Sequence, residues 1–231
     1  MKAKMLLLRA CAIILIVTMP CFLALTALFP LISSPFLRLQ YARPDIPPST
    51  KFAPQERQRL AEAAAHYLAS GEGIDYLANL TDPQGSPFFN DRELDHMVDV
   101  KILLRRAVAL DVVLGLLVVT SLGILVSQRE TRDRTPSYLI VASLVAPVLS
   151  IAALVLVTLQ FQWFFVEFHH LFFVGQTWLF PRSDTLIQLF PEMFWFAAFE
   201  SWILLLMAMS AAIGVGAYVW HRKRRTAVAS P

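Results

Sequence analysis

The chain is poor in cysteine and in charged residues. It has only two cysteines among 231 residues, and charged residues make up 16% of the total. Cys11 and Cys21 both fall in the first long apolar run, so they predict neither a disulfide framework nor a cysteine-ligated metal site. We expect both to be small packing residues of a helix.

The signatures of common soluble catalytic sites are also missing. The sequence has no Gly-x-Ser-x-Gly turn, Walker loop, His-Glu-x-x-His helix or Cys-x-x-Cys pair, and no Ser-His-Asp order. Internal repeats and low-complexity tracts are missing as well. We therefore predict no cofactor, and no side chain is marked as a nucleophile.

Apolar residues, in contrast, are abundant and are grouped in blocks. They account for 57% of the chain, and a soluble domain would instead distribute them with helix or strand periodicity. Four blocks reach the roughly 20 residues needed to cross a hydrocarbon core of about 30 Å. They lie near 6–29, 107–126, 137–159 and 194–220. The sequence thus predicts an all-α membrane protein with four transmembrane helices, forming a single integral membrane domain over residues 1–231.

The basic residues predict the orientation in the membrane. Half of the 20 Lys and Arg form three short, dense groups, at 2–9, 129–134 and 222–225. Cytoplasmic loops are enriched in such groups, so we expect both termini in the cytoplasm and the outer segments 37–106 and 161–193 on the other side. Because topology explains the net charge of +3, nucleic acid is not an expected partner. The first block is too long for a signal peptide and lacks a cleavage site, so we expect a retained helix.

The outer segment 37–106 predicts a helical and irregular insertion between the first two spans. Three prolines within 42–50 indicate an extended connector. Pro54 suits the first turn of a helix and Gly71 suits its end. His66, near the end of this helix, is interpreted as a solvated surface histidine.

A second helix is predicted to begin at Asn90 and to continue into the second span. Asn90 is a favourable N-cap, and Glu93 completes a capping box three residues later. With 3.6 residues per turn, Arg92, His96 and Asp99 share one polar stripe just outside the bilayer. The stripe offers an imidazole and a carboxylate for proton transfer, although a salt-bridged surface turn would have the same spacing.

The outer segment between spans 3 and 4 is rich in aromatic residues. Eleven of residues 161–194 are Phe or Trp, which predicts an interfacial aromatic belt or a re-entrant segment. Glu167, His169 and His170 lie within it. Polar groups in such surroundings cost several kcal/mol unless they are paired, and ionisable groups at membrane depth are functional candidates. Asp111 and Glu200, in spans 2 and 4, either orient a histidine or cap local hydrogen bonds.

These segments together resemble a bacterial family of four-span membrane proteins that includes the lipoprotein intramolecular transacylases (Lit). The resemblance covers nearly the whole chain in order and spacing. It rests on two runs and on the tryptophan and aspartate that follow them: Glu93, His96, Met97, Asp99, Val100 and Lys101, then Phe168, His169, Phe172, Phe173, Trp178 and Asp184. One departure is Phe180-Pro181, where the family tends to have Asp-Pro.

The resemblance implies a membrane acyltransferase with two catalytic histidines. It would move the sn-2 acyl chain of a diacylglyceryl lipoprotein onto that lipoprotein's own N-terminal cysteine amine, giving the lyso N-acyl form. The implied setting is the extracytoplasmic side of the bacterial plasma membrane, with membrane lipids as further partners. His96 and His169 would be the general acid and base. The other residues implied at the site are Asp99 or Glu93 to set the tautomer, Arg92 or Lys101 to steady the oxyanion, and Phe168, Phe172, Phe173, Trp178 and Asp184 to bind substrate.

Two other classes of function remain open on the sequence alone. One is a different lipid-directed or metal-assisted membrane hydrolase, with ligands drawn from His96, His169 or His170, Asp99 and Glu167. A hydrolase would release free fatty acid and would respond to chelators. The other is a non-catalytic membrane protein, which would tolerate the loss of either His96 or His169.

Overall fold

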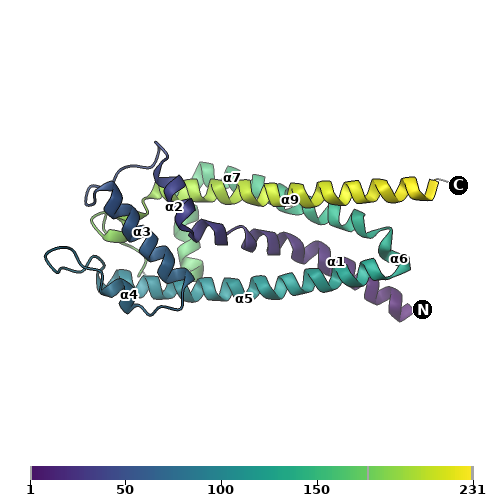
Figure 1. Cartoon of the computed structure of the whole chain (residues 1–231), viewed down its shortest axis with the longest axis horizontal. Helices are drawn as coiled ribbons and strands as arrows, with labels where there is room; N and C mark the ends of the chain where they lie inside the picture. The colour runs from purple at the N-terminus through teal and green to yellow at the C-terminus, as the bar shows by residue number, and fades with distance from the viewer. Residues whose placement is uncertain (1, 176, 230–231) are drawn as a thin grey trace. The chain divides into compact units, whose positions relative to one another are not determined.

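The structure is a computed structural model that describes residues 2–175 and 177–229, without the side chains of residues 225 and 227–229. Helices make up its regular structure, and the described residues form no strand, only a single bridge between Thr81 and Pro87. The predicted all-α class is therefore confirmed. The helices, shown in Figure 1, are α1 Lys2–Thr26, η1 Phe29–Ile32, α2 Ser34–Tyr41, α3 Pro54–Ala69, α4 Asp75–Ala78, α5 Asp91–Ser127, α6 Arg129–Arg132, α7 Thr135–Phe172, α8 Thr185–Leu189 and α9 Glu192–Ala229.

Four helical stretches are long and apolar enough to cross a membrane, which confirms the predicted number. They are Lys2–Ile32, Asp91–Ser127, Thr135–Phe172 and Glu192–Arg224, and each contains one of the four predicted spans. Many of their large apolar side chains are exposed, such as Leu116 at 63% and Val148 at 65%. Water would penalise so much exposed apolar surface, whereas hydrocarbon does not.

Helix α5 begins where the capping residues predict. The backbone N–H of Asn90 donates to Glu93 Oε2 at 2.9 Å, and the backbone N–H of Glu93 donates to Asn90 Oδ1 at 3.0 Å. This reciprocal pair is the predicted capping box. The helix then continues without a break for 37 residues, about 55 Å at 1.5 Å per residue, so its first turns extend beyond the predicted span.

Helix α7 breaks where its predicted span ends. Gln160 has a non-helical backbone, with φ −142° and ψ 45°, directly after the predicted span 137–159. Residues 161–172 therefore form a separate helical arm, which aromatic composition alone did not predict. Within this arm only His169 is buried.

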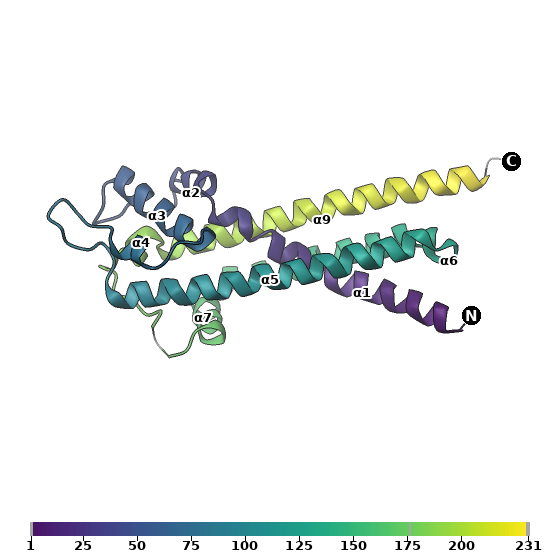
Figure 2. The ribbon, with the colours of Figure 1, turned by 60° about the horizontal axis from the view of Figure 1, so that its bottom comes forward.

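The chain forms two compact units. The first, the span unit, comprises Met1–Ala27, Val108–Leu154 and Ile203–Pro231, and the second, the head unit, comprises Leu28–Ala107 and Val155–Trp202. In the span unit, the short helix α6 connects α5 to α7 (Figure 2). There the hydroxyl of Thr26 donates to the carboxylate of Asp111, at 3.2 and 3.3 Å from its two oxygens. Asp111 is thus paired locally between α1 and α5.

Helix α3 lies at the centre of the head unit. On one side, Leu60, Ala64 and Tyr67 pack in a core with residues of α4, α5 and α8. On another side, Ala61 and Ala65 pack in a second core with residues of α2 and α9. The structure thus buries two sides of this helix, and alanines make up much of the second contact.

A close approach of two helices in the span unit gives a test of the packing. A Cβ atom at Gly214 of α9 would lie 2.8 Å from Ser143 Oγ of α7, whereas one at Gly216 would meet nothing within 4 Å. Alanine in place of a helical glycine otherwise stabilises by up to about 1 kcal/mol. We expect Gly216→Ala to raise the melting temperature in detergent. Gly214→Ala should melt at a lower temperature than Gly216→Ala. Adding Ser143→Ala to Gly214→Ala should recover the lost melting temperature. Equal melting temperatures of Gly214→Ala and Gly216→Ala would contradict this packing.

Candidate functional site

Two histidines from distant parts of the chain meet in the head unit. His96 lies on the second turn of α5, and His169 lies on the arm of α7. Their ring centroids are 6.3 Å apart, with an angle of 25° between the ring planes. The structure thus brings together the two imidazoles that the sequence singled out.

Aromatic rings surround the two imidazoles. The ring centroid of His169 lies 4.6 Å from that of Trp178, in a stacked arrangement at 30°, and 4.2 Å from that of Phe165. The ring of His96 lies 5.0 Å from Phe173 and 5.4 Å from Phe180. We call Phe165, His96, His169, Phe173, Trp178 and Phe180 the aromatic cage. The contact of Phe180 was not predicted, because only the fold carries this loop residue onto α5.

One hydrogen bond defines the tautomer of His169. Its Nδ1 lies 2.7 Å from the backbone oxygen of Phe165, one turn earlier in the arm. A carbonyl oxygen only accepts, so Nδ1 carries the proton and donates it. In the neutral ring Nε2 is then without a proton and is free to accept one.

Several polar atoms at the cage lack a partner among the described residues. They are Nδ1 of His96, Nε1 of Trp178 and Oγ1 of Thr177, all of them buried. Leaving such a group unsatisfied costs about 1–3 kcal/mol, and native structures contain few. Three of them in and beside one cage are typical of a site that water or a bound molecule completes.

The two predicted orienting carboxylates do not contact the imidazoles. Glu93 is 1% exposed, and its oxygens accept from the backbone N–H groups of Asn90 and Leu186. Asp99 is exposed, and within the described part of the chain its carboxylate has no hydrogen bond. The group that orients His169 is instead the Phe165 carbonyl.

The two predicted oxyanion donors have different surroundings. Arg92 forms an ion pair with Asp184 at 3.1 Å, and its guanidinium lies 5.3 Å from the centre of the Phe180 ring. Arg92 therefore contacts the cage. Lys101 is 5% exposed. Its Nζ donates to the backbone oxygen of Glu72 at 2.6 Å and lies 3.9 Å from the centre of the Tyr67 ring.

The remaining aromatic candidates line the exposed side of the arm. Phe168 is 40% exposed and Phe172 is 45% exposed, and their ring centroids lie 4.9 Å apart. Phe168 also meets the ring of His169 edge-on at 5.5 Å. The apolar surface of these two rings thus extends outward from an imidazole.

Other ionisable candidates lie outside the cage. His170 and Glu167 approach to 4.0 Å on the exposed side of the arm. His66 is exposed, as expected, with its ring 5.2 Å from that of Tyr76. Among the residues that the structure describes, no three His, Cys, Asp or Glu side chains come close enough together to hold a metal ion.

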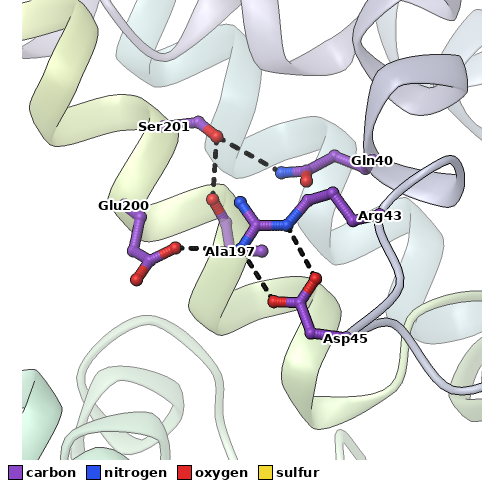
Figure 3. A network of polar contacts seen from close by, with 6 residues as sticks. All are labelled: Gln40, Arg43, Asp45, Ala197, Glu200 and Ser201. Atoms are coloured by element: carbon purple, nitrogen blue, oxygen red, sulfur yellow. Dashed lines mark hydrogen bonds and ion pairs between the residues drawn. The ribbon is translucent and has the colours of Figure 1, made fainter.

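Glu200 belongs to a polar network that joins α9 to the end of α2. Figure 3 shows the guanidinium of Arg43 between two carboxylates, at 2.7 Å from Asp45 and 3.2 Å from Glu200. The hydrogen bond from Arg43 lowers the pKa of Asp45. Beside it, Gln40 donates to the hydroxyl of Ser201 at 3.4 Å. Glu200 is thus paired locally and does not orient a histidine.

Comparisons with known proteins agree with the family that the sequence resembles. The family model described as lipoprotein intramolecular transacylase Lit matches residues 12–195. An uncharacterized protein of Aquifex aeolicus (strain VF5) is 27% identical over 165 residues, 71% of this chain and 73% of the relative.

Among solved structures, the membrane-integral lipoprotein intramolecular transacylase Lit from Bacillus cereus has a TM-score of 0.73 at 19% identity, with 95% of this chain and 98% of that chain covered. A form of that protein with one histidine replaced by arginine gives 0.71 at 18%, with 96% and 95% covered. This likeness shows that the two proteins share a fold.

The proton on His169 Nδ1 can be tested directly. In protein labelled with ¹⁵N-histidine, we expect the neutral ring of His169 to give the coupling pattern of an Nδ1–H tautomer, because the Phe165 carbonyl holds that proton. The His169→Gln variant would identify the signal by its loss. An Nε2–H pattern for this ring would contradict the assignment.

Proposed function

Because the chain belongs to the lipoprotein intramolecular transacylase Lit family, which matches residues 12–195, we propose that it moves an acyl chain within a diacylglyceryl lipoprotein. The predicted family and the predicted class, a membrane acyltransferase, are confirmed by this match. The substrate, the acyl position and the roles of individual residues are proposals that rest on the geometry of the head unit.

The observation that supports this activity best is the pair of imidazoles inside an aromatic cage. The ring centroids of His96 and His169 are 6.3 Å apart, and none of the six residues that form the cage carries a hydroxyl or a thiol. Such a site suits a substrate that brings its own nucleophile and leaving group. A diacylglyceryl lipoprotein does so, because its N-terminal amine and its sn-2 ester belong to one molecule. Holding both in reach of each other supplies much of the rate.

In the proposed reaction the amine nitrogen attacks the carbonyl carbon of the sn-2 ester. Both imidazoles start neutral, because burial lowers the pKa of His96 to about 4 and also lowers the pKa of His169. His169 Nε2 accepts the amine proton, and His96 takes that proton from His169 and donates it to the glycerol oxygen. An amide C–N bond forms and the ester C–O bond breaks, leaving an N-acyl lipoprotein with a free glycerol hydroxyl. Both imidazoles are then neutral again for the next turnover. Each proton transfer is worth about 10²–10⁴-fold in rate.

The surrounding residues fit supporting roles. Arg92, which contacts Phe180 of the cage, is the proposed stabiliser of the oxyanion. The Phe165 carbonyl sets the tautomer of His169, so neither Glu93 nor Asp99 is needed for that task. Phe168 and Phe172 offer exposed rings to the acyl chains, and burial of a ring yields about 1.5–3 kcal/mol.

The proposed orientation follows the distribution of basic residues. Both termini lie in the cytoplasm, and the cage works on the extracytoplasmic side of the bacterial plasma membrane. Two of the basic groups form ion pairs within the span unit, Lys4 with Glu130 and Arg224 with Asp133. The lipoprotein would reach the cage from the outer leaflet, among membrane lipids.

The activity is tested in a bacterium that lacks other N-acylating enzymes. Mass spectrometry of lipoprotein N-termini should find the N-acyl lyso form when the chain is expressed. His96→Ala and His169→Ala should each lower its yield about 10²–10⁴-fold, since each removes a proton-transfer group. His66→Ala, at an exposed histidine outside the cage, is a control that should stay near wild type.

The same experiment distinguishes the alternatives. Only free-amine diacyl forms in cells with wild-type protein would contradict the proposal. Release of free fatty acid, with loss of activity in the presence of a chelator, would point to a metal-assisted hydrolase. An unchanged product pattern in both histidine variants would point to a cage without a catalytic role.

A further inference from the structure

Three buried charged side chains of the head unit bond to backbone atoms and have no ion-pair partner among the described residues. They are Arg57 at 6% exposure, Glu93 at 1% and Lys101 at 5%. Burying a charge is expensive unless hydrogen bonds compensate for the lost water. Their bonds run to other segments of the unit, so each one fixes two segments to each other.

Two of these charges hold the same short helix, α8. At its start, the N–H of Leu186 donates to Glu93 Oε1 at 2.7 Å. At its end, the backbone oxygen of Leu189 accepts from Arg57 Nη2 at 3.2 Å and from the hydroxyl of Tyr41 at 2.8 Å. These bonds satisfy end groups that a helix leaves without internal partners.

The bond from Tyr41 is firm because its hydroxyl stays protonated. Burial raises the pKa of Tyr41, and Arg57 opposes that rise only in part. The Arg57 guanidinium lies 4.6 Å from the centre of the Tyr41 ring and also donates to the backbone oxygen of Pro47 at 2.7 Å. The anchor at the end of α8 is therefore built from α2, α3 and the connector between them.

Helix α8 directly follows the loop that supplies two walls of the aromatic cage. Trp178 stacks on His169, and Phe180 contacts His96. Asp184, the last residue before α8, forms the ion pair with Arg92. Thr185 donates to the backbone oxygen of Phe88, just before α5. Because the loop continues directly into α8, fixing α8 also fixes the end of the loop.

Glu93 also stands one turn before His96 on the same helix. Its second oxygen accepts from the N–H of Asn90, which anchors the start of α5. A single carboxylate therefore joins the beginning of the helix that carries His96 to the loop that carries Trp178 and Phe180.

We propose that Glu93 and Arg57 are positioning residues, which clamp α8 from both ends and so hold the Trp178–Phe180 loop against the two imidazoles. This role rests on the proposed acyl transfer. It assigns Glu93 no proton transfer. A displacement of about 1 Å in such a site can lower the rate about 10²-fold.

Activity variants separate positioning from catalysis. Glu93→Ala and Arg57→Ala should each lower acyl transfer about 10–10²-fold. The double variant should lose no more than the worse single variant, because both act through α8. Glu93→Gln keeps an oxygen for the Leu186 N–H, so it should retain activity within about tenfold of wild type, with an unchanged pH profile.

Matched controls stand on the same helices. Asp95→Asn on α5 and Arg59→Ala on α3 alter exposed charges close to the clamp, and they should stay within about twofold of wild type, as surface changes usually do. If Arg57→Ala does not fold, Tyr41→Phe removes one bond to Leu189 and keeps the ring beneath Arg57. It should give a smaller loss in the same direction.

Hydrogen–deuterium exchange tests the clamp without relying on activity. Glu93→Ala and Arg57→Ala should speed exchange of residues 178–190 and leave the protection of α3 unchanged. Wild-type exchange in this segment for both variants would overturn the proposal, even if the chain proves not to transfer acyl groups. The proposal also fails if Glu93→Gln is as inactive as His96→Ala with a shifted pH profile, since Glu93 would then be catalytic.

Discussion

The head unit depends on buried charges that are satisfied by backbone groups. Arg57, Glu93 and Lys101 each hold a segment of another part of the unit through a carbonyl or an N–H. An ion pair between two flexible side chains would tie only side chains together. A charge bonded to the main chain fixes the path of the chain itself, and it does so strongly because the bond is charge-assisted and shielded from water.

This arrangement explains how a loop and a short helix can form a fixed part of the site. The loop that carries Trp178 and Phe180 has little regular structure of its own, and α8 has only five residues. Such segments are mobile unless something holds them. Helices α3 and α5 are longer and more rigid, and their buried charges fix the segments that form part of the aromatic cage. The ring contacts then hold the two imidazoles with their centroids 6.3 Å apart.

The sequence predicts those features that depend on local or compositional signals. The four spans follow from the length of the apolar blocks, and the start of α5 follows from Asn90 and Glu93 three residues apart. The residues alone mark His96, His169 and His170 as candidates, but only the family resemblance pairs His96 with His169, because no rule of spacing brings residues 73 positions apart together. Geometry alone reveals the Phe165 carbonyl as the partner of His169, and Leu186 as the partner of Glu93. Both partners are backbone groups, which nearly every residue type offers, so the sequence does not indicate these contacts.

The exposure of the arm formed by residues 161–172 makes its packing depend on the medium around the protein. His169 is its only buried residue, and Leu171 beside it is 75% exposed. One side of the arm packs against α9 through Phe161 and Phe164, and lipid acyl chains or detergent tails are the packing partner of its exposed side. The surrounding hydrocarbon therefore contributes to the packing of the arm that carries His169. A micelle that fits the arm poorly would disturb an imidazole without altering any residue of the chain.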